Sequence, residues 1–158
     1  MKHLPDFLRT VLGGLLLACL FTGCSTYSSQ WHQAAKTTPP AGSIAGAWEG
    51  YWLSNSNGHT GKLRCIITPQ TGDQYDFHYW ATFWKVFSYS YRAQFTVQKT
   101  NDLYILHGKK DLGYWAGGAY THDGQGSATN FVSTYHSKYD AGIFHLQRPA
   151  EADCGCGK

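Results

Sequence analysis

Apolar and polar residues alternate through most of the region 44–149, and β-branched and aromatic types dominate the apolar positions. In the cleanest run, 88–98, Tyr89, Tyr91, Ala93, Phe95 and Val97 alternate with polar neighbours. A period of two residues is typical of a strand with one buried face. Seven further runs share this character: 48–53, 62–68, 74–84, 103–108, 114–120, 129–135 and 142–147. The pattern therefore predicts an all-β domain of about eight strands.

Most of these runs are separated by residues that favour tight turns. The turn signals are Asn57-Gly58, Thr71-Gly72-Asp73, Asn101-Asp102, Asp123-Gly124 and Asp140-Ala141-Gly142. Connections this short make consecutive strands antiparallel. The junction 85–87 has no Gly, Pro, Asn or Asp, so residues 74–98 are also readable as one long bent strand. No segment of the domain has a helical period with caps, so we expect no helix in its core.

An antiparallel meander protects its edges by closing into a barrel or by folding into a sandwich. Clustered glycines favour the barrel, because sharply bent strands need residues without a Cβ. These glycines are Gly108, Gly113, Gly117, Gly118, Gly124 and Gly126. We predict a small closed or partly closed antiparallel barrel. The interior of an eight-stranded barrel is either filled by side chains or holds one small ligand, and the sequence leaves both open.

Residues 1–23 have the three parts of an export signal: basic residues at Lys2 and Arg9, an apolar run at 11–21, and small residues before Cys24. The run is shorter than the about 20 residues that a membrane-spanning helix needs. The stretch 20–24, Leu-Phe-Thr-Gly-Cys, resembles the lipobox of bacterial lipoproteins, with Phe21 where Leu is commonest. This resemblance implies that Cys24 is acylated with palmitate-type chains and that Ser25 directs the protein to the outer membrane. An ordinary secreted protein or a short membrane anchor is the alternative.

The chain divides into a signal peptide at 1–23, a disordered tether at 24–43, the barrel domain at 44–149 and a flexible tail at 150–158. The tether is assigned from its Ser, Thr, Gln, Ala and Pro content and its few large apolar residues. After residue 23 the chain keeps 11 Lys plus Arg against 9 Asp plus Glu, since Lys2, Arg9 and Asp6 leave with the signal. Charges this balanced give no electrostatic case for nucleic acid.

The start of the first predicted strand, Gly46-Ala47-Trp48, resembles the Gly-x-Trp opening of the calycin superfamily of small β-barrels. Arg148 stands after the last strand, where many lipocalins in that superfamily carry a basic residue. The resemblance implies that Trp48 plugs one end of the barrel and that Arg148 packs across its ring. The resemblance implies no particular ligand for this chain.

Aromatic residues are abundant after residue 23, where 6 Trp, 11 Tyr and 6 Phe remain once Phe7 and Phe21 are removed. Large rings fill a small core efficiently. On the inner faces we expect Trp48, Trp52, Phe77, Tyr79, Phe83, Phe95, Phe131 and Phe144. Trp80 and Trp84 fall on the opposite face of run 74–84. Outward indoles indicate a contact site for a sugar ring, a partner protein or the membrane interface, unless they pack under a loop or the tether.

The histidines and serines carry no catalytic or metal-binding signature. No HxH, HExxH or Gly-x-Ser-x-Gly arrangement occurs, and we expect no metal and no cofactor. His59 and His122 stand beside turn residues, so we expect both in loops. A pair of His59 with Asp123 would require two loops to meet.

Three cysteines remain beyond Cys19, in the signal, and Cys24. Cys65 alternates with Leu63 and Ile67, which predicts a buried thiol. Cys154 and Cys156 either pair with each other, pair with another chain, or supply two ligands to a soft metal.

These observations predict a non-enzymatic cell-envelope lipoprotein, anchored in the outer membrane and facing the periplasm. Its barrel would bind an envelope protein, a glycan or a small apolar ligand through aromatic residues. The alternatives are a structural scaffold with a filled barrel and a small envelope hydrolase. Convergence of His59, Asp76, Asp123 or Asp140 would favour the hydrolase. An open barrel lined by Tyr and Trp would favour binding.

Overall fold

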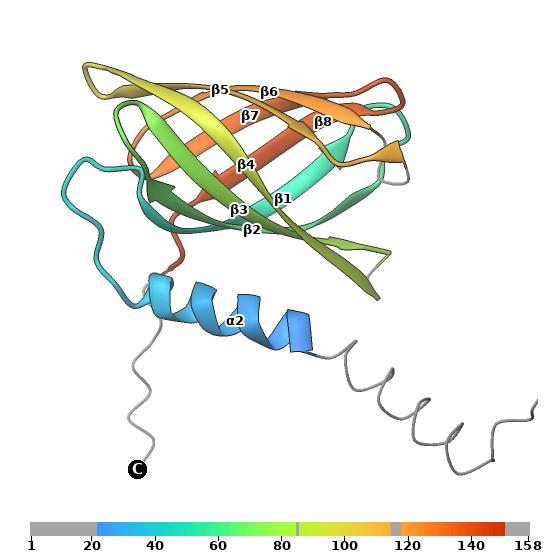
Figure 1. The fold of residues 1–158 in the computed structure, drawn as a ribbon, viewed down its shortest axis with the longest axis horizontal. Coiled ribbons are helices and arrows are strands. Elements are labelled where there is room, and N and C mark those ends of the chain that lie inside the picture. Colours follow the sequence, from blue (N-terminus) through green and yellow to red (C-terminus); the bar gives the residue numbers. More distant parts are fainter. Residues whose placement is uncertain (1–21, 85, 115–117, 151–158) are drawn as a thin grey trace, which may run out of the picture. The chain divides into compact units, whose positions relative to one another are not determined.

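Eight antiparallel strands close into a barrel, which confirms the predicted fold class (Figure 1). The computed structural model describes residues 22–84, 86–114 and 118–150. The strands are β1 (Gly46–Ser54), β2 (Thr60–Pro69), β3 (Gln74–Phe83), β4 (Phe87–Thr100), β5 (Leu103–Asp111), β6 (Ala119–Gly126), β7 (Asn130–His136) and β8 (Ala141–Gln147). The described helix is α2 (Thr22–Ala35).

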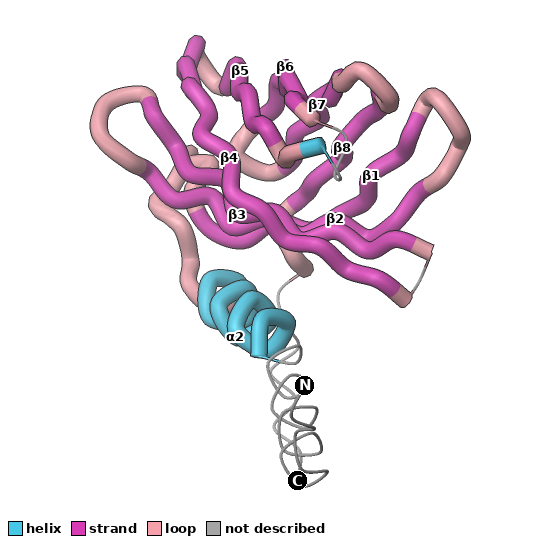
Figure 2. Tube along the Cα trace, turned by 45° about the vertical axis from the view of Figure 1, so that its right-hand side comes forward, coloured by secondary structure: helices cyan, strands magenta, loops and turns pink. Residues whose placement is uncertain are grey.

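Each strand pairs with the next along the chain, and β1 also pairs with β8 (Figure 2). In that closing pair Trp52 lies opposite Phe144 and Gly50 lies opposite Leu146. Closure joins the first and last strands, but β4 pairs with β5 only from Phe95 to Thr100. Among the described strands, the part of β4 before Phe95 therefore has a partner on the β3 side alone. The junction that allowed one long bent strand is a turn, because Phe83 pairs with Phe87 and the Val86 N–H donates to the Phe83 carbonyl at 3.2 Å.

The up-and-down topology places alternate connections at opposite ends of the barrel. The β1–β2, β3–β4, β5–β6 and β7–β8 connections share one end, which we call the open end. The other connections, the entry to β1 and the exit from β8 share the closed end. The two ends differ in how completely side chains fill them.

The closed end is filled around Trp48, which is 0% exposed. The Trp48 Nε1 donates to the Ile44 carbonyl at 2.8 Å, and its ring meets Phe131 edge-on with centroids 4.9 Å apart. The Arg148 Cζ lies 4.0 Å from the centre of the Trp48 ring. The Arg148 guanidinium also donates to four backbone carbonyls, those of Ser43, Ala45, Ala47 and Ala128. The pair that the calycin resemblance implied is therefore in contact, and it ties both chain ends of the domain together.

The sixth strand begins and ends later than the predicted run 114–120, and Asp123-Gly124 lies inside it rather than in a turn. The glycines of β6 face crowded neighbours on β7. A Cβ on Gly126 would lie 2.1 Å from the Phe131 Cβ, and a Cβ on Gly124 would lie 2.6 Å from the Ser133 Cβ. Glycine here permits close strand packing, so the Asp-Gly pair that resembles a hairpin turn is part of the barrel wall.

Helix α2 occupies much of the segment 24–43 that we predicted to be a disordered tether. From Trp31 onward this segment belongs to the same compact unit as the barrel. The Trp31 Nε1 donates to the Trp48 carbonyl at 3.0 Å, and the Arg64 Cζ lies 4.1 Å from the Trp31 ring centre. The Tyr104 hydroxyl donates to the Gly42 carbonyl. The tether prediction missed these contacts because a single large ring can anchor an otherwise polar segment.

No helix in the described part of the chain is long and apolar enough to cross a membrane. The apolar run 11–21 of the predicted signal and the tail 151–158, with Cys154 and Cys156, lie outside the described residues.

Candidate functional site

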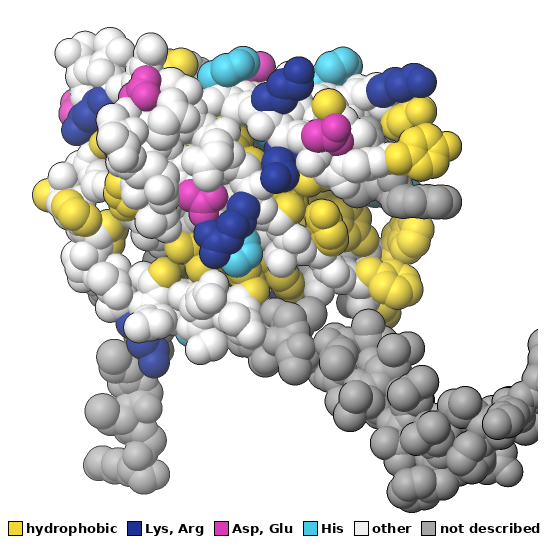
Figure 3. Space-filling view, viewed as in Figure 1, with side chains coloured by type: hydrophobic (Ala, Val, Ile, Leu, Met, Phe, Trp, Pro, Cys, Tyr) yellow, Lys and Arg dark blue, Asp and Glu magenta, His cyan; other side chains and the backbone are white. Residues whose placement is uncertain are grey.

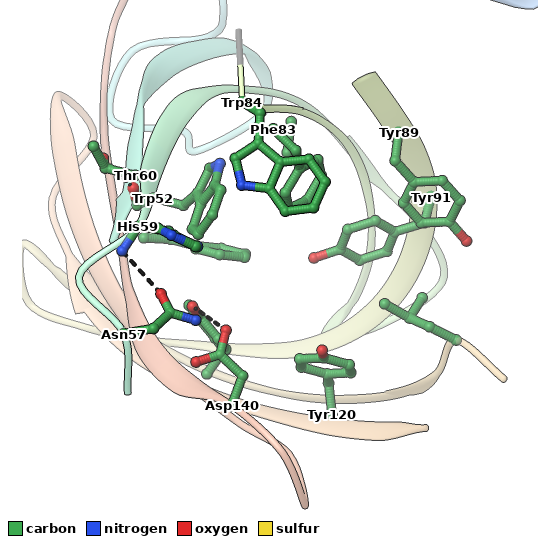
Figure 4. A pocket seen from close by; sticks show the side chains of 14 residues that line it. Trp52, Asn57, His59, Thr60, Phe83, Trp84, Tyr89, Tyr91, Tyr120 and Asp140 are labelled. Atoms are coloured by element: carbon green, nitrogen blue, oxygen red, sulfur yellow. Dashed lines mark hydrogen bonds between the residues drawn. The ribbon is translucent and has the colours of Figure 1, made fainter. Parts of the chain in front are cut away.

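A cavity of about 530 Å³ occupies the open end of the barrel (Figure 4). All four connections at this end contribute to its wall, through Asn57, Trp84, Leu112 and Asp140 among others. A volume of this size falls in the range of roughly 300 to 1,000 Å³ that is typical of small-molecule sites. The barrel is thus filled at one end and hollow at the other.

Aromatic rings form most of the cavity wall. They are Trp52, Phe83, Trp84, Tyr89, Tyr91, Tyr120, Tyr135 and Phe144. The period of two explains their number, because β3 and β4 direct successive odd-numbered residues toward the interior. Trp52 is fixed by a bond from its Nε1 to the Thr82 carbonyl at 2.9 Å. The wall is rigid and apolar on this side.

Trp84 lies at the mouth of the cavity rather than on the outer wall. Its φ of 47° is unusual for a bulky residue and turns the chain away from the direction of β3. Its ring lies 6.4 Å from the His59 ring and 6.3 Å from the Phe87 ring, and it is 72% exposed. Figure 3 shows apolar side chains gathered at this end of the barrel. Trp84 is therefore placed to contact a molecule that enters the cavity.

Trp80, the other outward indole of the sequence prediction, lies half-buried on the outer wall. The Arg64 Cζ lies 5.9 Å from its ring centre, and the same guanidinium stacks on Trp31. Trp80 does not line the cavity that Trp84 lines. The two residues that we expected on one face therefore belong to different parts of the surface, because the chain turns at Trp84.

A carboxylate forms the polar part of the cavity wall. Asp140 accepts a hydrogen bond from the Ser54 hydroxyl at 2.6 Å through Oδ1, and from the Tyr135 hydroxyl at 3.0 Å through Oδ2. Burial, followed by the bond to Asp140, raises the pKa of Tyr135 well above its ordinary value. The phenol therefore stays protonated and holds the carboxylate in place.

The remaining polar rim comes from the β1–β2 connection. The His59 backbone N–H donates to the Asn57 Oδ1 at 2.9 Å, and the Thr60 hydroxyl donates to the Trp52 carbonyl. His59 lies in a loop, as we expected from its neighbours. The second of these bonds links the start of β2 to β1 beside the opening.

His122 lies inside the barrel, where the sequence led us to expect a loop residue. It is 1% exposed and packs among Tyr79, Phe95, Tyr135 and Phe144, with ring centroids 5.5 to 6.5 Å away. Neither ring nitrogen has a hydrogen-bond partner in the described structure. Burial lowers the pKa of His122 to about 4, against a smaller opposing effect of Asp123. His122 stands two residues after Tyr120, so the period of two was a sequence signal for an inward position. The Asp-Gly pair that follows His122 obscured this signal.

Of the four polar residues whose convergence would indicate a hydrolase, two share the cavity and two lie elsewhere. Asp76 faces the outer wall and accepts hydrogen bonds from Arg92 and Gln94. Asp123 is exposed and pairs with the His107 Nδ1 at 2.6 Å. His59 and Asp140 both line the cavity. The structure therefore rules out the pairing of His59 with Asp123.

The described residues form neither a reactive cysteine site nor a metal site. Cys65 is buried in the barrel core, and burial raises the pKa of its thiol. The described part of the chain contains no group of three or more His, Cys, Asp or Glu residues that could hold a metal ion. Cys24 lies within α2.

Comparisons with protein-family models, with curated proteins and with solved structures find no match to this chain.

Proposed function

We propose that this protein is a non-enzymatic lipoprotein of the bacterial cell envelope whose barrel binds one small, largely apolar molecule at its open end. The proposal joins two arguments. The lipobox-like stretch that ends at Cys24 supports a lipid anchor in the outer membrane, on the periplasmic side. The cavity supports the binding of a ligand.

The observation that carries the binding function is the cavity of about 530 Å³, walled by aromatic side chains, in a barrel whose other end is sealed by Trp48. A scaffold protein gains stability when its core is filled, since each buried methylene that is missing costs free energy. An unfilled end therefore favours a binding role over the filled-barrel scaffold. The calycin-like features at Trp48 and Arg148 agree with a barrel that is closed at one end.

The hydrolase alternative has less support. A hydrolytic site needs a base and an orienting or acidic group close to the reacting atom. Of the four polar residues considered, His59 and Asp140 share the cavity, whereas Asp76 and Asp123 are engaged on the outer wall. We assign the polar rim to ligand binding.

The experiment uses the protein from residue 24 onward, without lipid, and the neutral fluorescent dye N-phenyl-1-naphthylamine. We expect saturable binding of one dye molecule. Ala81 is buried and lines the cavity, so Ala81→Phe should fill part of the space and weaken dye binding at least about tenfold, a loss of about 1.4 kcal/mol.

Ser90→Phe is the matched control, because it adds the same ring at an exposed position of β4. It should bind the dye like the wild type. A folded Ala81→Phe protein that binds with unchanged affinity would place the dye elsewhere, and a wild-type protein that binds no dye would contradict the proposed function.

A further inference from the structure

We propose that the ligand of the cavity is a small organic cation, an amine or quaternary ammonium group on an apolar body, whose charge is recognised by Asp140 and the surrounding aromatic rings. This inference rests on the proposed function and specifies the chemistry of the ligand.

The first argument is the charge of the wall. Asp140 supplies a carboxylate at the cavity, and none of the described residues that line it is Lys or Arg. Within the described residues Asp140 forms no ion pair, although two other aspartates of the barrel, Asp76 and Asp123, do. A carboxylate partly removed from water without a counter-charge is unfavourable. A cationic ligand would supply the missing charge.

The second argument is the geometry of the carboxylate. Ser54 and Tyr135 each donate one hydrogen bond, to different oxygens of Asp140. Each carboxylate oxygen has about two acceptor sites, so an acceptor position remains on both. Both donors come from the barrel wall: Ser54 is the last residue of β1, and Tyr135 lies on β7. The carboxylate is thus held by two strands of the barrel, and the hydrogen bonds that it accepts from described side chains are these two.

The third argument is the ring set. Figure 4 shows Trp84, Tyr91 and Tyr120 around the opening that Asp140 also borders. The faces of Trp and Tyr rings carry negative electrostatic potential and attract cations, most strongly when water is excluded. Several such rings together with one carboxylate form the kind of wall that recognises an ammonium group with an apolar substituent. The same wall would repel an apolar carboxylic acid, because Asp140 lies in it.

The test compares three ligands that differ at one group: 4-phenylbutylamine, 4-phenylbutanol and 4-phenylbutanoate. At pH 7 the amine is a cation and the acid is an anion. Isothermal titration of the protein from residue 24 onward should give the tightest binding for the amine. We expect a preference over the alcohol of at least about tenfold, and the acid should bind most weakly.

Two variants locate the effect. Asp140→Asn removes the charge and keeps the shape, so the amine should lose its preference while the affinity for the alcohol stays close to that of wild type. Asp123→Asn is the matched control, because this carboxylate is 66% exposed and lies on the outer wall. It should keep the full preference for the amine.

The outcomes separate this inference from the proposed function. The wild type could bind all three ligands with affinities within about threefold, or could bind the acid best. In either case the proposal of a cationic ligand is wrong, and the proposed binding of an apolar molecule stands. A preference for the amine that persists in Asp140→Asn would overturn the role of Asp140. If neither these ligands nor the neutral dye binds, both proposals fail. The ranking in the wild type alone decides the question should Asp140→Asn not fold.

Discussion

Replacing His122 with Phe is expected to remove a pH-dependent loss of stability from the barrel. His122 is enclosed by rings from β3, β4, β7 and β8, namely Tyr79, Phe95, Tyr135 and Phe144. None of these side chains offers a negative charge to an imidazolium. Asp123, the adjacent residue, is exposed and already paired with His107. Protonating His122 inside the barrel is therefore costly.

The magnitude follows from the pKa, which falls from an ordinary 6.5 to about 4 in the folded protein. Between these values the unfolded chain binds the proton and the folded barrel does not. The contribution of neutral His122 to the free energy of unfolding is therefore fully present above pH 6.5 and is lost as the pH falls toward 4. One unit of pKa corresponds to about 1.4 kcal/mol, so the total loss is about 3 kcal/mol, of which about 2 kcal/mol is expressed at pH 5.

The assay is urea denaturation at pH 7, 6 and 5 for the wild type and His122→Phe. A larger ring changes packing, which adds a constant offset, so the informative quantity is how the difference between the two proteins varies with pH. We expect this difference to move by about 2 kcal/mol in favour of the variant from pH 7 to pH 5. His136→Phe replaces an exposed imidazole on β7 and serves as the control. Parallel pH profiles for wild type and His122→Phe would refute the reasoning.

Two further predictions concern the anchor and the closed end. Metabolic labelling with an alkyne palmitate analogue should mark the wild type and not Cys24→Ala, and equal labelling of both would contradict acylation at Cys24. Trp48→Ala should lower the free energy of unfolding by about 3 to 5 kcal/mol, because a fully buried ring leaves a cavity. Arg148→Ala should cost about 2 kcal/mol, since it loses the stacking on Trp48 and the bonds to backbone carbonyls. Equal denaturation midpoints for Trp48→Ala and wild type would show that the ring does not seal the barrel.

The strands were predictable because alternation is a local property of the chain. In the run 88–98 the odd-numbered residues face the interior in the structure, as the period of two requires. The glycine cluster correctly indicated a barrel, although the structure gives its members other roles than strand bending: Gly113 and Gly118 have positive φ and open space around them. Gly124 and Gly126 lack the Cβ atoms that would clash with β7. Gly124 also misled the assignment of β6, because the pair Asp123-Gly124 has the same appearance in a turn and in a tightly packed strand.

The segment before the barrel shows a different limit. Its composition resembles a disordered tether, yet Trp31 docks on the Trp48 carbonyl and beneath the Arg64 guanidinium. Whether one ring anchors a polar segment depends on a complementary surface elsewhere in the fold. Composition alone carries no information about that surface.

By itself, the sequence of this protein determined the fold class, most of the strands and the inward faces of regular runs such as 88–98, since these depend on neighbours two residues apart. The tertiary structure decided that one end is filled and the other hollow, and that Asp140 meets Ser54, a residue 86 positions away. Such a contact depends on the register of every strand between the two residues and on the closure of β8 onto β1. It also depends on the turn at Trp84, where one unusual φ moves an indole from the outer wall to the mouth of the cavity. The candidate site is built from these long-range relations, and for that reason only the folded barrel reveals it.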